Sequence, residues 1–137
     1  MPHLTLEYSA NLENRIDIRA LCETLLSATL STRLFEEGAI RVRALRADHY
    51  AVADEHPENA FIDLNLRIGA GRNDQEKKRV GETVFAAARD VLSHLFDSPY
   101  FALSMEIREI DPDLSWRKNA IHPRLRGKMN PTASRGN

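Results

Sequence analysis

Cysteine, excess charge and long apolar runs are all scarce in this sequence, and each scarcity excludes a class of protein. The single cysteine, Cys22, cannot form a disulfide within the chain, which suits a reducing cytoplasm. The formal net charge of −1 argues against a nucleic-acid-binding protein, whose binding face would make the domain basic. No apolar run approaches the ~18 residues of a membrane span, and no signal peptide is recognisable. We expect one cytoplasmic domain without a nucleic-acid or membrane partner.

The usual signatures of metal, cofactor and nucleophile sites are also missing. Gly69-Ala70-Gly71 does not begin a dinucleotide fingerprint, because Asp74 stands where the third glycine is required. No nucleophile elbow, Cys–His pair or phosphate-binding loop occurs. No metal-ligand spacing connects the five histidines, which are His3, His49, His56, His94 and His122. The sequence therefore predicts neither a metal nor a cofactor.

Two halves of the chain repeat one order of elements. Residues 3–8 and 40–45 alternate polar and apolar side chains as half-buried strands do, and apolar residues at helical spacing predict a helix over residues 12–34. In the second half, strands are predicted at 61–68 and 103–110. The helix between them should begin at the cap residue Asn73, with Glu76 as its reciprocal partner, and continue to Leu95. Each half, about residues 2–50 and 60–111, is therefore a βαβ unit with parallel strands.

These units predict an α/β (α+β) fold with a four-stranded sheet and two helices on one face. The opposite face would be bare, and we expect apolar side chains there to be covered by another subunit, which predicts an oligomer. The domain should occupy residues 1–125, including a C-terminal segment in which Trp116 and Ile121 can be buried. Residues 126–137 should form a basic, flexible tail.

Pro2 is the first candidate for chemistry because it directly follows Met1. Removal of Met1 would leave a free secondary amine, whose pKa is lowered by burial or by a neighbouring cation. A base with a pKa near the working pH suits proton abstraction next to a carbonyl. A retained Met1 would turn the nitrogen into an amide without basicity. The structural alternative is that Pro2 only begins a strand at a sheet edge, where a missing N–H costs nothing.

Arginines are the second group of candidates. Arg72 follows Gly69-Ala70-Gly71 and precedes a helix, whose N-terminus favours an anion. Arg41 and Arg43 share one face of a predicted strand, where a guanidinium fork suits a carboxylate, although such a pair is also common on solvated faces. A terminal amine with arginines, and no metal or nucleophile, suits proton transfer on an anionic keto–enol substrate.

Several of these features together resemble the tautomerase superfamily, and within it the 5-carboxymethyl-2-hydroxymuconate isomerase family. They are Pro2 behind Met1, the two βαβ repeats, Ile-Arg-Val-Arg at residues 40–43 and Leu-Arg-Ile-Gly-Ala-Gly-Arg at residues 66–72. Residues 103–107 and 116–122 are similar to that family too, so the resemblance covers about residues 2–125.

The resemblance implies a homotrimer with active sites between subunits and a keto–enol tautomerisation without cofactor, in homoprotocatechuate (4-hydroxyphenylacetate) degradation. Pro2 would be the catalytic base, and Arg41 and Arg72 would bind a di- or tricarboxylate substrate, with Arg43 as the alternative to Arg41. Two alternatives remain open at this point. One is another activity of the superfamily, such as a 4-oxalocrotonate-type tautomerase, an oxo-acid decarboxylase or a hydratase. The other is a non-catalytic trimer that binds an anionic metabolite.

Overall fold

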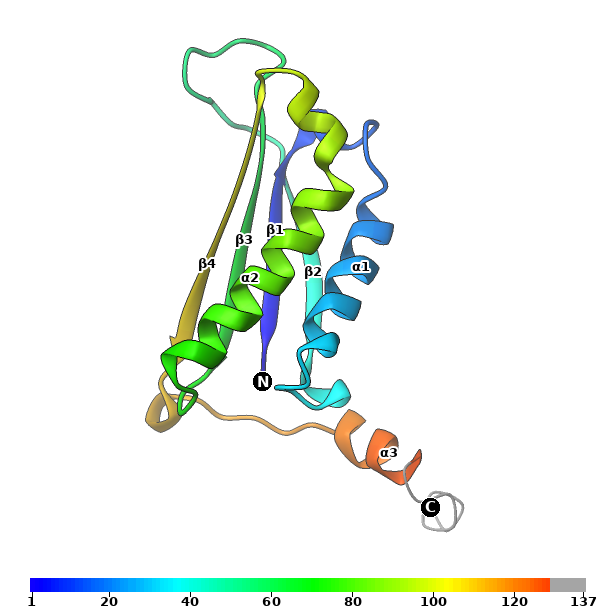
Figure 1. Ribbon diagram of the computed structural model, residues 1–137, viewed down its shortest axis with the longest axis vertical. Coiled ribbons are helices and arrows are strands. Elements are labelled where there is room, and N and C mark those ends of the chain that lie inside the picture. The colour runs from blue at the N-terminus through cyan, green and yellow to red at the C-terminus, as the bar shows by residue number, and fades with distance from the viewer. Residues whose placement is uncertain (129–137) are drawn as a thin grey trace.

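A mixed sheet of four strands carries the fold of residues 1–128, the part of the chain that the computed structural model describes (Figure 1). The strands β1 (His3–Ser9), β2 (Arg41–Ala47), β3 (Ala60–Gly69) and β4 (Phe101–Ile110) lie in the order β2-β1-β3-β4. β1 runs parallel to β2, and β3 runs parallel to β4, as two βαβ units require. The units meet through the antiparallel pair β1–β3. The expected α+β fold with two βαβ repeats is confirmed.

Two helices, α1 (Ile18–Ser31) and α2 (Asp74–Val91), lie side by side on one face of the sheet (Figure 1). Each buries residues that recur every four positions and so form one stripe on its surface, namely Leu21 and Leu25 in α1 and Val80, Val84 and Ala88 in α2. Every second residue of β3, from Ala60 to Ile68, is buried beneath these stripes. Within residues 1–128, every helix is too short or too polar to span a bilayer.

The expected bounds of the first helix are wrong at both ends. α1 begins at Ile18 because the Asp17 carboxylate accepts a hydrogen bond from the Ala20 N–H and caps the helix. The residues before it form a 3-10 turn, Ala10–Leu12, whose buried leucine had extended the apolar pattern. α1 ends at Ser31, and Arg33 then adopts a left-handed φ of 59° that no helix can continue.

The second helix begins where the sequence predicts. Asn73 accepts from the Glu76 N–H at 2.8 Å, and the Glu76 carboxylate accepts in return from the Asn73 N–H at 3.2 Å. This reciprocal pair satisfies two donors that the helix cannot pair internally. α2 ends at Val91, and a 3-10 turn, Ser93–Asp97, continues past the expected end at Leu95. The capping pair also sets the backbone that immediately follows Arg72.

The uncovered face of the sheet is mainly polar, so the expectation of exposed apolar side chains is met there at Leu45, which is 50% exposed, but not along most of the face. In register across the strands, one row of this face consists of Arg41, His3, Arg67 and Arg108, and the next of Arg43, Thr5, Asn65 and Glu106. Hydrogen bonds join neighbouring strands here, such as Ser104 to Asp63 at 2.7 Å. The alternation of polar and apolar residues places nearly all large apolar side chains on the helix side. This face therefore offers little apolar area for contact with another subunit.

The segment after β4 runs past the N-terminus and ends in α3 (Ile121–Lys128), which packs on the 3-10 turn Glu37–Ala39 (Figure 1). The expected burial of Trp116 is wrong within this chain, since the side chain is 85% exposed, and Ile121 is also exposed. The expected tail begins inside α3, where Arg126 forms two hydrogen bonds, of 2.7 and 2.6 Å, with the Glu36 carboxylate. The rest of that tail, residues 129–137, lies outside the described residues.

Candidate active site

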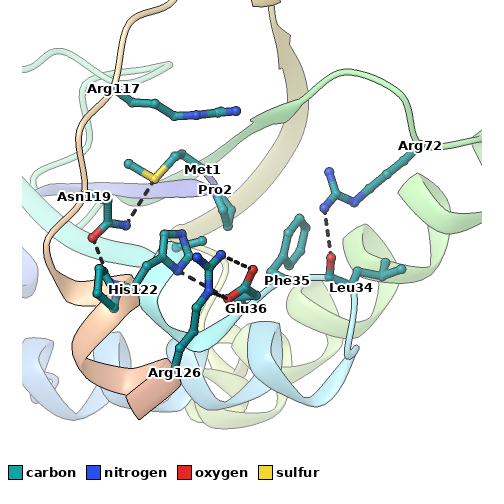
Figure 2. Close-up of a pocket in the computed structure, with 12 residues that line it drawn as sticks. Met1, Pro2, Leu34, Phe35, Glu36, Arg72, Arg117, Asn119, His122 and Arg126 are labelled. Atoms are coloured by element: carbon teal, nitrogen blue, oxygen red, sulfur yellow. Dashed lines mark hydrogen bonds and ion pairs between the residues drawn. The ribbon is translucent and has the colours of Figure 1, made fainter. Parts of the chain in front are cut away.

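The N-terminus lies at the end of a central strand, beside a cavity of about 540 Å³ (Figure 2). Pro2 is buried, and its carbonyl accepts a hydrogen bond of 3.1 Å from the Arg41 N–H, which ties the start of β1 to β2. Four parts of the chain form the cavity wall: residues 1–2, the loop that includes residues 34–39, Arg72, and side chains between residues 117 and 126. Because β1 is paired on both sides, the terminus has a fixed position. This refutes the alternative that Pro2 begins an edge strand.

Arg72 lies in the cavity wall, as its place after a glycine turn predicts. Gly71 has a φ of +111°, which side chains rarely allow, and so it permits the turn that leads into Arg72. The Arg72 guanidinium lies 4.4 Å from the centre of the Phe35 ring and donates to the Leu34 carbonyl at 2.9 Å. Within residues 1–128 no carboxylate pairs with it. Its charge is therefore held in place but is not neutralised.

The side chains of Arg41 and Arg43 have different neighbours in the structure although the two residues share a strand face. The half-buried Arg41 guanidinium donates to the Ala39 carbonyl at 2.8 Å and contacts the Met1 sulfur at 3.2 Å. It reaches the N-terminus without lining the cavity itself. The exposed Arg43 instead contacts the His3 ring at 3.3 Å on the open sheet face. Of the two, Arg41 is the one beside the terminal residues.

The C-terminal segment supplies wall residues to which the sequence analysis assigned no role. Arg117 lines the cavity and, like Arg72, forms no ion pair within the described chain. In Figure 2 the N-terminus lies between Arg117 and Arg72. Asn119 donates to the Gly38 carbonyl at 2.9 Å and contacts the Met1 sulfur at 3.6 Å. The similarity of residues 116–122 to the isomerase family was the only signal that could have pointed to them.

A polar cluster fastens α3 over the side of the cavity. Glu36 accepts both hydrogen bonds of Arg126, and its carboxylate lies 3.5 Å from Nδ1 of His122 (Figure 2). Arg126 is the main reason that the pKa of Glu36 lies below its usual range. Glu36 and Arg126 neutralise each other, so the positive charge that remains at the cavity comes from Arg72 and Arg117.

These charges act on the terminal amine. The terminal amine of this chain belongs to Met1, and removal of Met1 would transfer it to Pro2, which lines the same cavity. Burial, followed by the charges of Arg117, Arg72 and Arg41, lowers the pKa of this amine below its ordinary value of 8.0. Both causes disfavour the ammonium form. The site therefore favours a neutral amine, which is the form that can accept a proton.

No set of three histidine, cysteine or carboxylate side chains within residues 1–128 is arranged to hold a metal ion. Besides the Glu36–Arg126 pair and the imidazole of His122, the cavity offers a terminal amine, the guanidinium groups of Arg72 and Arg117, which form no ion pair within residues 1–128, and the amide of Asn119. These groups can bind anions and move one proton.

Comparison with known proteins agrees with this inventory. The family model described as 5-carboxymethyl-2-hydroxymuconate isomerase matches residues 2–125. The chain belongs to this family. The 5-carboxymethyl-2-hydroxymuconate Delta-isomerase of Escherichia coli is 31% identical over 122 residues, which cover 89% of this chain and 97% of that protein. The expectation of an isomerase in the tautomerase superfamily is confirmed.

Solved structures give the same result. A 5-carboxymethyl-2-hydroxymuconate isomerase from Deinococcus radiodurans R1 has a TM-score of 0.85 and 41% identity, covering 90% of this chain and 93% of its own. A fused 4-OT, described as a symmetric trimer, has a TM-score of 0.58 and 16% identity over 85% of this chain and 93% of its own. At that identity the second likeness concerns the fold alone.

We predict that Gly38→Ala loosens α3 from the cavity wall. A Cβ at Gly38 would lie 3.0 Å from Nδ1 of His122 and 3.1 Å from its backbone N and Cα. Backbone atoms cannot rotate away, so the attachment of α3 should weaken by about 1–3 kcal/mol, the usual cost of overpacking. Amide hydrogen exchange across residues 121–128 measures the effect.

Gly69→Ala is the matched control, because nothing lies within 4 Å of the Cβ it would add and its φ is outside the left-handed range. Faster exchange in α3 for Gly38→Ala alone is the expected result. Equal exchange in both variants would contradict the close packing of α3 on this turn.

Proposed function

We propose that the chain is a 5-carboxymethyl-2-hydroxymuconate Δ-isomerase, a cofactor-independent keto–enol tautomerase that serves homoprotocatechuate degradation. The observation that carries this proposal is an N-terminus in the wall of a cavity whose arginines Arg72 and Arg117, without an ion pair within residues 1–128, disfavour a protonated amine. Membership of the isomerase family supplies the reaction and the substrate class.

The reaction moves one proton and requires no other reactant. The neutral Pro2 amine takes the hydroxyl proton of the 2-hydroxy-2,4-dienoate. The oxygen lone pair then forms the C2 carbonyl, the C2–C3 double bond moves to C3–C4, and the former C4–C5 double bond supplies the electron pair that binds a proton at carbon 5. The prolinium ion delivers that proton, so the amine returns to its neutral form. Substrate and product have the same atoms and the same charge.

The arginines serve this reaction twice. Arg72 is held by the Leu34 carbonyl and the Phe35 ring, which leaves other guanidinium N–H groups free for a substrate carboxylate. Arg41, which contacts Met1, is the second residue that we assign to substrate. Positive charge near the oxygen of the dienolate stabilises that anion as it forms. The same charge disfavours the protonated form of the resting amine.

We also propose that the active unit is a homotrimer, as the resemblance to the tautomerase superfamily implies. Leu114 and Trp116, which are 71% and 85% exposed, lie next to the N-terminus, and such neighbouring apolar side chains are typical of a protein interface. In this arrangement a neighbouring subunit covers them and closes the site.

Sedimentation equilibrium is expected to give three times the mass of the chain for the unmodified protein. The double variant Leu114→Ser, Trp116→Ser should dissociate, because it removes the apolar area that the neighbour covers. Val91→Ser is the control, since Val91 is an exposed apolar residue on α2. A monomeric unmodified protein would contradict the trimer, and a double variant that stays trimeric would place the interface elsewhere.

We predict that Arg72→Ala lowers kcat/KM by about 10²–10³-fold. This is the effect of removing the guanidinium from its charge pair with the substrate carboxylate at the transition state. Arg79→Ala is the matched control, because Arg79 also donates to a carbonyl after α1, that of Thr32 at 2.9 Å, but does not line the cavity. Both variants lose a hydrogen bond of this kind, and Arg72→Ala also loses a longer one, 3.5 Å to the Gly69 carbonyl, and its contact with the Phe35 ring. The unfolding free energy of each variant is therefore measured, and activity is compared for folded protein. Comparable activity of the two variants would remove Arg72 from the mechanism.

We predict that activity requires removal of Met1 and rises with pH through the amine pKa. A lowered pKa means that the neutral base is present above that value and is lost as the pH falls through it. The inflection of kcat/KM should therefore lie below the ordinary α-amino range of about 7.7–8.0. The form that keeps Met1, prepared with an aminopeptidase inhibitor and checked by intact mass, should lose about 10²–10⁴-fold, the contribution of a general base.

The ultraviolet change of the enol-to-ketone conversion measures both forms. Pro2→Ala is the control, because after removal of Met1 it keeps a primary amine and should retain part of the activity. Equal rates with and without Met1 would show that the proline amine does not act as the base.

A further inference from the structure

A second cavity lies on the other side of the N-terminus, between the open sheet face and the segment after β4. Its volume is about 570 Å³, and its wall includes His3 and Arg67 from the sheet and Trp116 and Lys118 from the segment. Met1 and Arg117 line both this cavity and the one that contains Arg72. These two residues therefore form the partition between the cavities.

The second cavity is positively charged. Arg67, Arg117 and Lys118 line it, none of them forms an ion pair within residues 1–128, and no carboxylate side chain belongs to its wall. His3 lies in register between Arg41 and Arg67. Burial, followed by the charges of Arg67, Arg43 and Arg41, lowers the pKa of His3 and so disfavours its protonated form. The positive charge that is unpaired within residues 1–128 suits an anionic ligand.

Met1 is the removable part of the partition. Its sulfur contacts the guanidinium of Arg41 at 3.2 Å and the amide of Asn119 at 3.6 Å, so the side chain is held between the cavities. Removal of Met1, which the proposed function requires, takes this side chain away. The Pro2 amine, which lies in the wall of the first cavity, is then next to the space that Met1 leaves between the two cavities.

The chemistry of the proposed substrate fits this boundary. Carbon 5 receives the proton from the amine, and carbon 5 also carries the carboxymethyl arm. The arm therefore begins beside the amine. When the main chain of the substrate lies in the cavity of Arg72, the arm starts at the partition and has the second cavity in front of it.

We propose that the second cavity is the subsite for the carboxymethyl arm, with Arg67 and Lys118 as the residues that select a tricarboxylate over a dicarboxylate. This inference rests on the proposed function. Arg117, which lines both cavities, contributes to the binding of the main chain and of the arm.

The test compares kcat/KM for 5-carboxymethyl-2-hydroxymuconate and for 2-hydroxymuconate, which lacks the arm, in Arg67→Met and Lys118→Met. Each variant should lose about 10- to 100-fold toward the tricarboxylate, the effect of one hydrogen bond to a charged group. Each should change less than about 3-fold toward the dicarboxylate. Arg108→Met is the matched control, because Arg108 lies beside Arg67 in register but pairs with Glu106 at 3.1 Å.

Equal losses toward both substrates, or no loss toward the tricarboxylate, would overturn the subsite. A loss of activity could also arise because the substitution disrupts a subunit interface. Sedimentation of each variant tests this: a variant whose oligomeric state differs from that of the unmodified protein would place its residue in an interface and not in the subsite.

A binding measurement separates the subsite from the proposed reaction. Titration calorimetry on the protein without Met1 should show tighter binding of propane-1,2,3-tricarboxylate than of glutarate, and Arg67→Met should remove that preference. If the protein converts neither enol but this preference is found and lost as expected, the proposed function fails and the subsite stands. Binding of inorganic phosphate as tight as that of the tricarboxylate would show an unselective anion site and overturn the inference.

Discussion

The pairing of β1 on both of its edges is the constraint on which the site depends. A chain terminus usually frays, but here the first strand lies between β2 and β3, and the Pro2 carbonyl is already bonded to the Arg41 N–H. The hydrogen bond of the Pro2 carbonyl and the pairing that begins at His3 therefore position residue 2 beside the cavity. A terminal amine can act as a base at a defined position only when the backbone holds it in this way.

Unpaired positive charge is the second feature of the site. Arg72 is held by a carbonyl and an aromatic ring, and Arg117 has no carboxylate partner within residues 1–128. Glu36, the carboxylate in the wall, is instead bound by Arg126. This arrangement costs stability in the free protein, because like charges repel. Before the substrate binds, these charges disfavour the protonated amine. A bound anionic substrate would then offset the repulsion between the arginines.

The sequence predicted the parts of the site that have a local signal. Pro2 is recognisable from its neighbour Met1, and Arg72 from the glycine turn and the helix cap on either side of it. Arg117 and Asn119 have no such signal, because they lie in an extended segment. The pairing of β4 with β3 places that segment beside the N-terminus. The choice between Arg41 and Arg43 also needed the structure, since both share one strand face and only side-chain direction separates them.

By itself the sequence determined the two βαβ repeats, the side of the sheet that the helices cover, the start of α2 and the chemistry available to the chain. Each of these follows from periodicity or from residues that are close neighbours in the sequence. Tertiary structure alone decided that Trp116 stays exposed within this chain and that two cavities meet at Met1. These features depend on strand register and on the path of residues 111–120, which bring together residues more than a hundred positions apart.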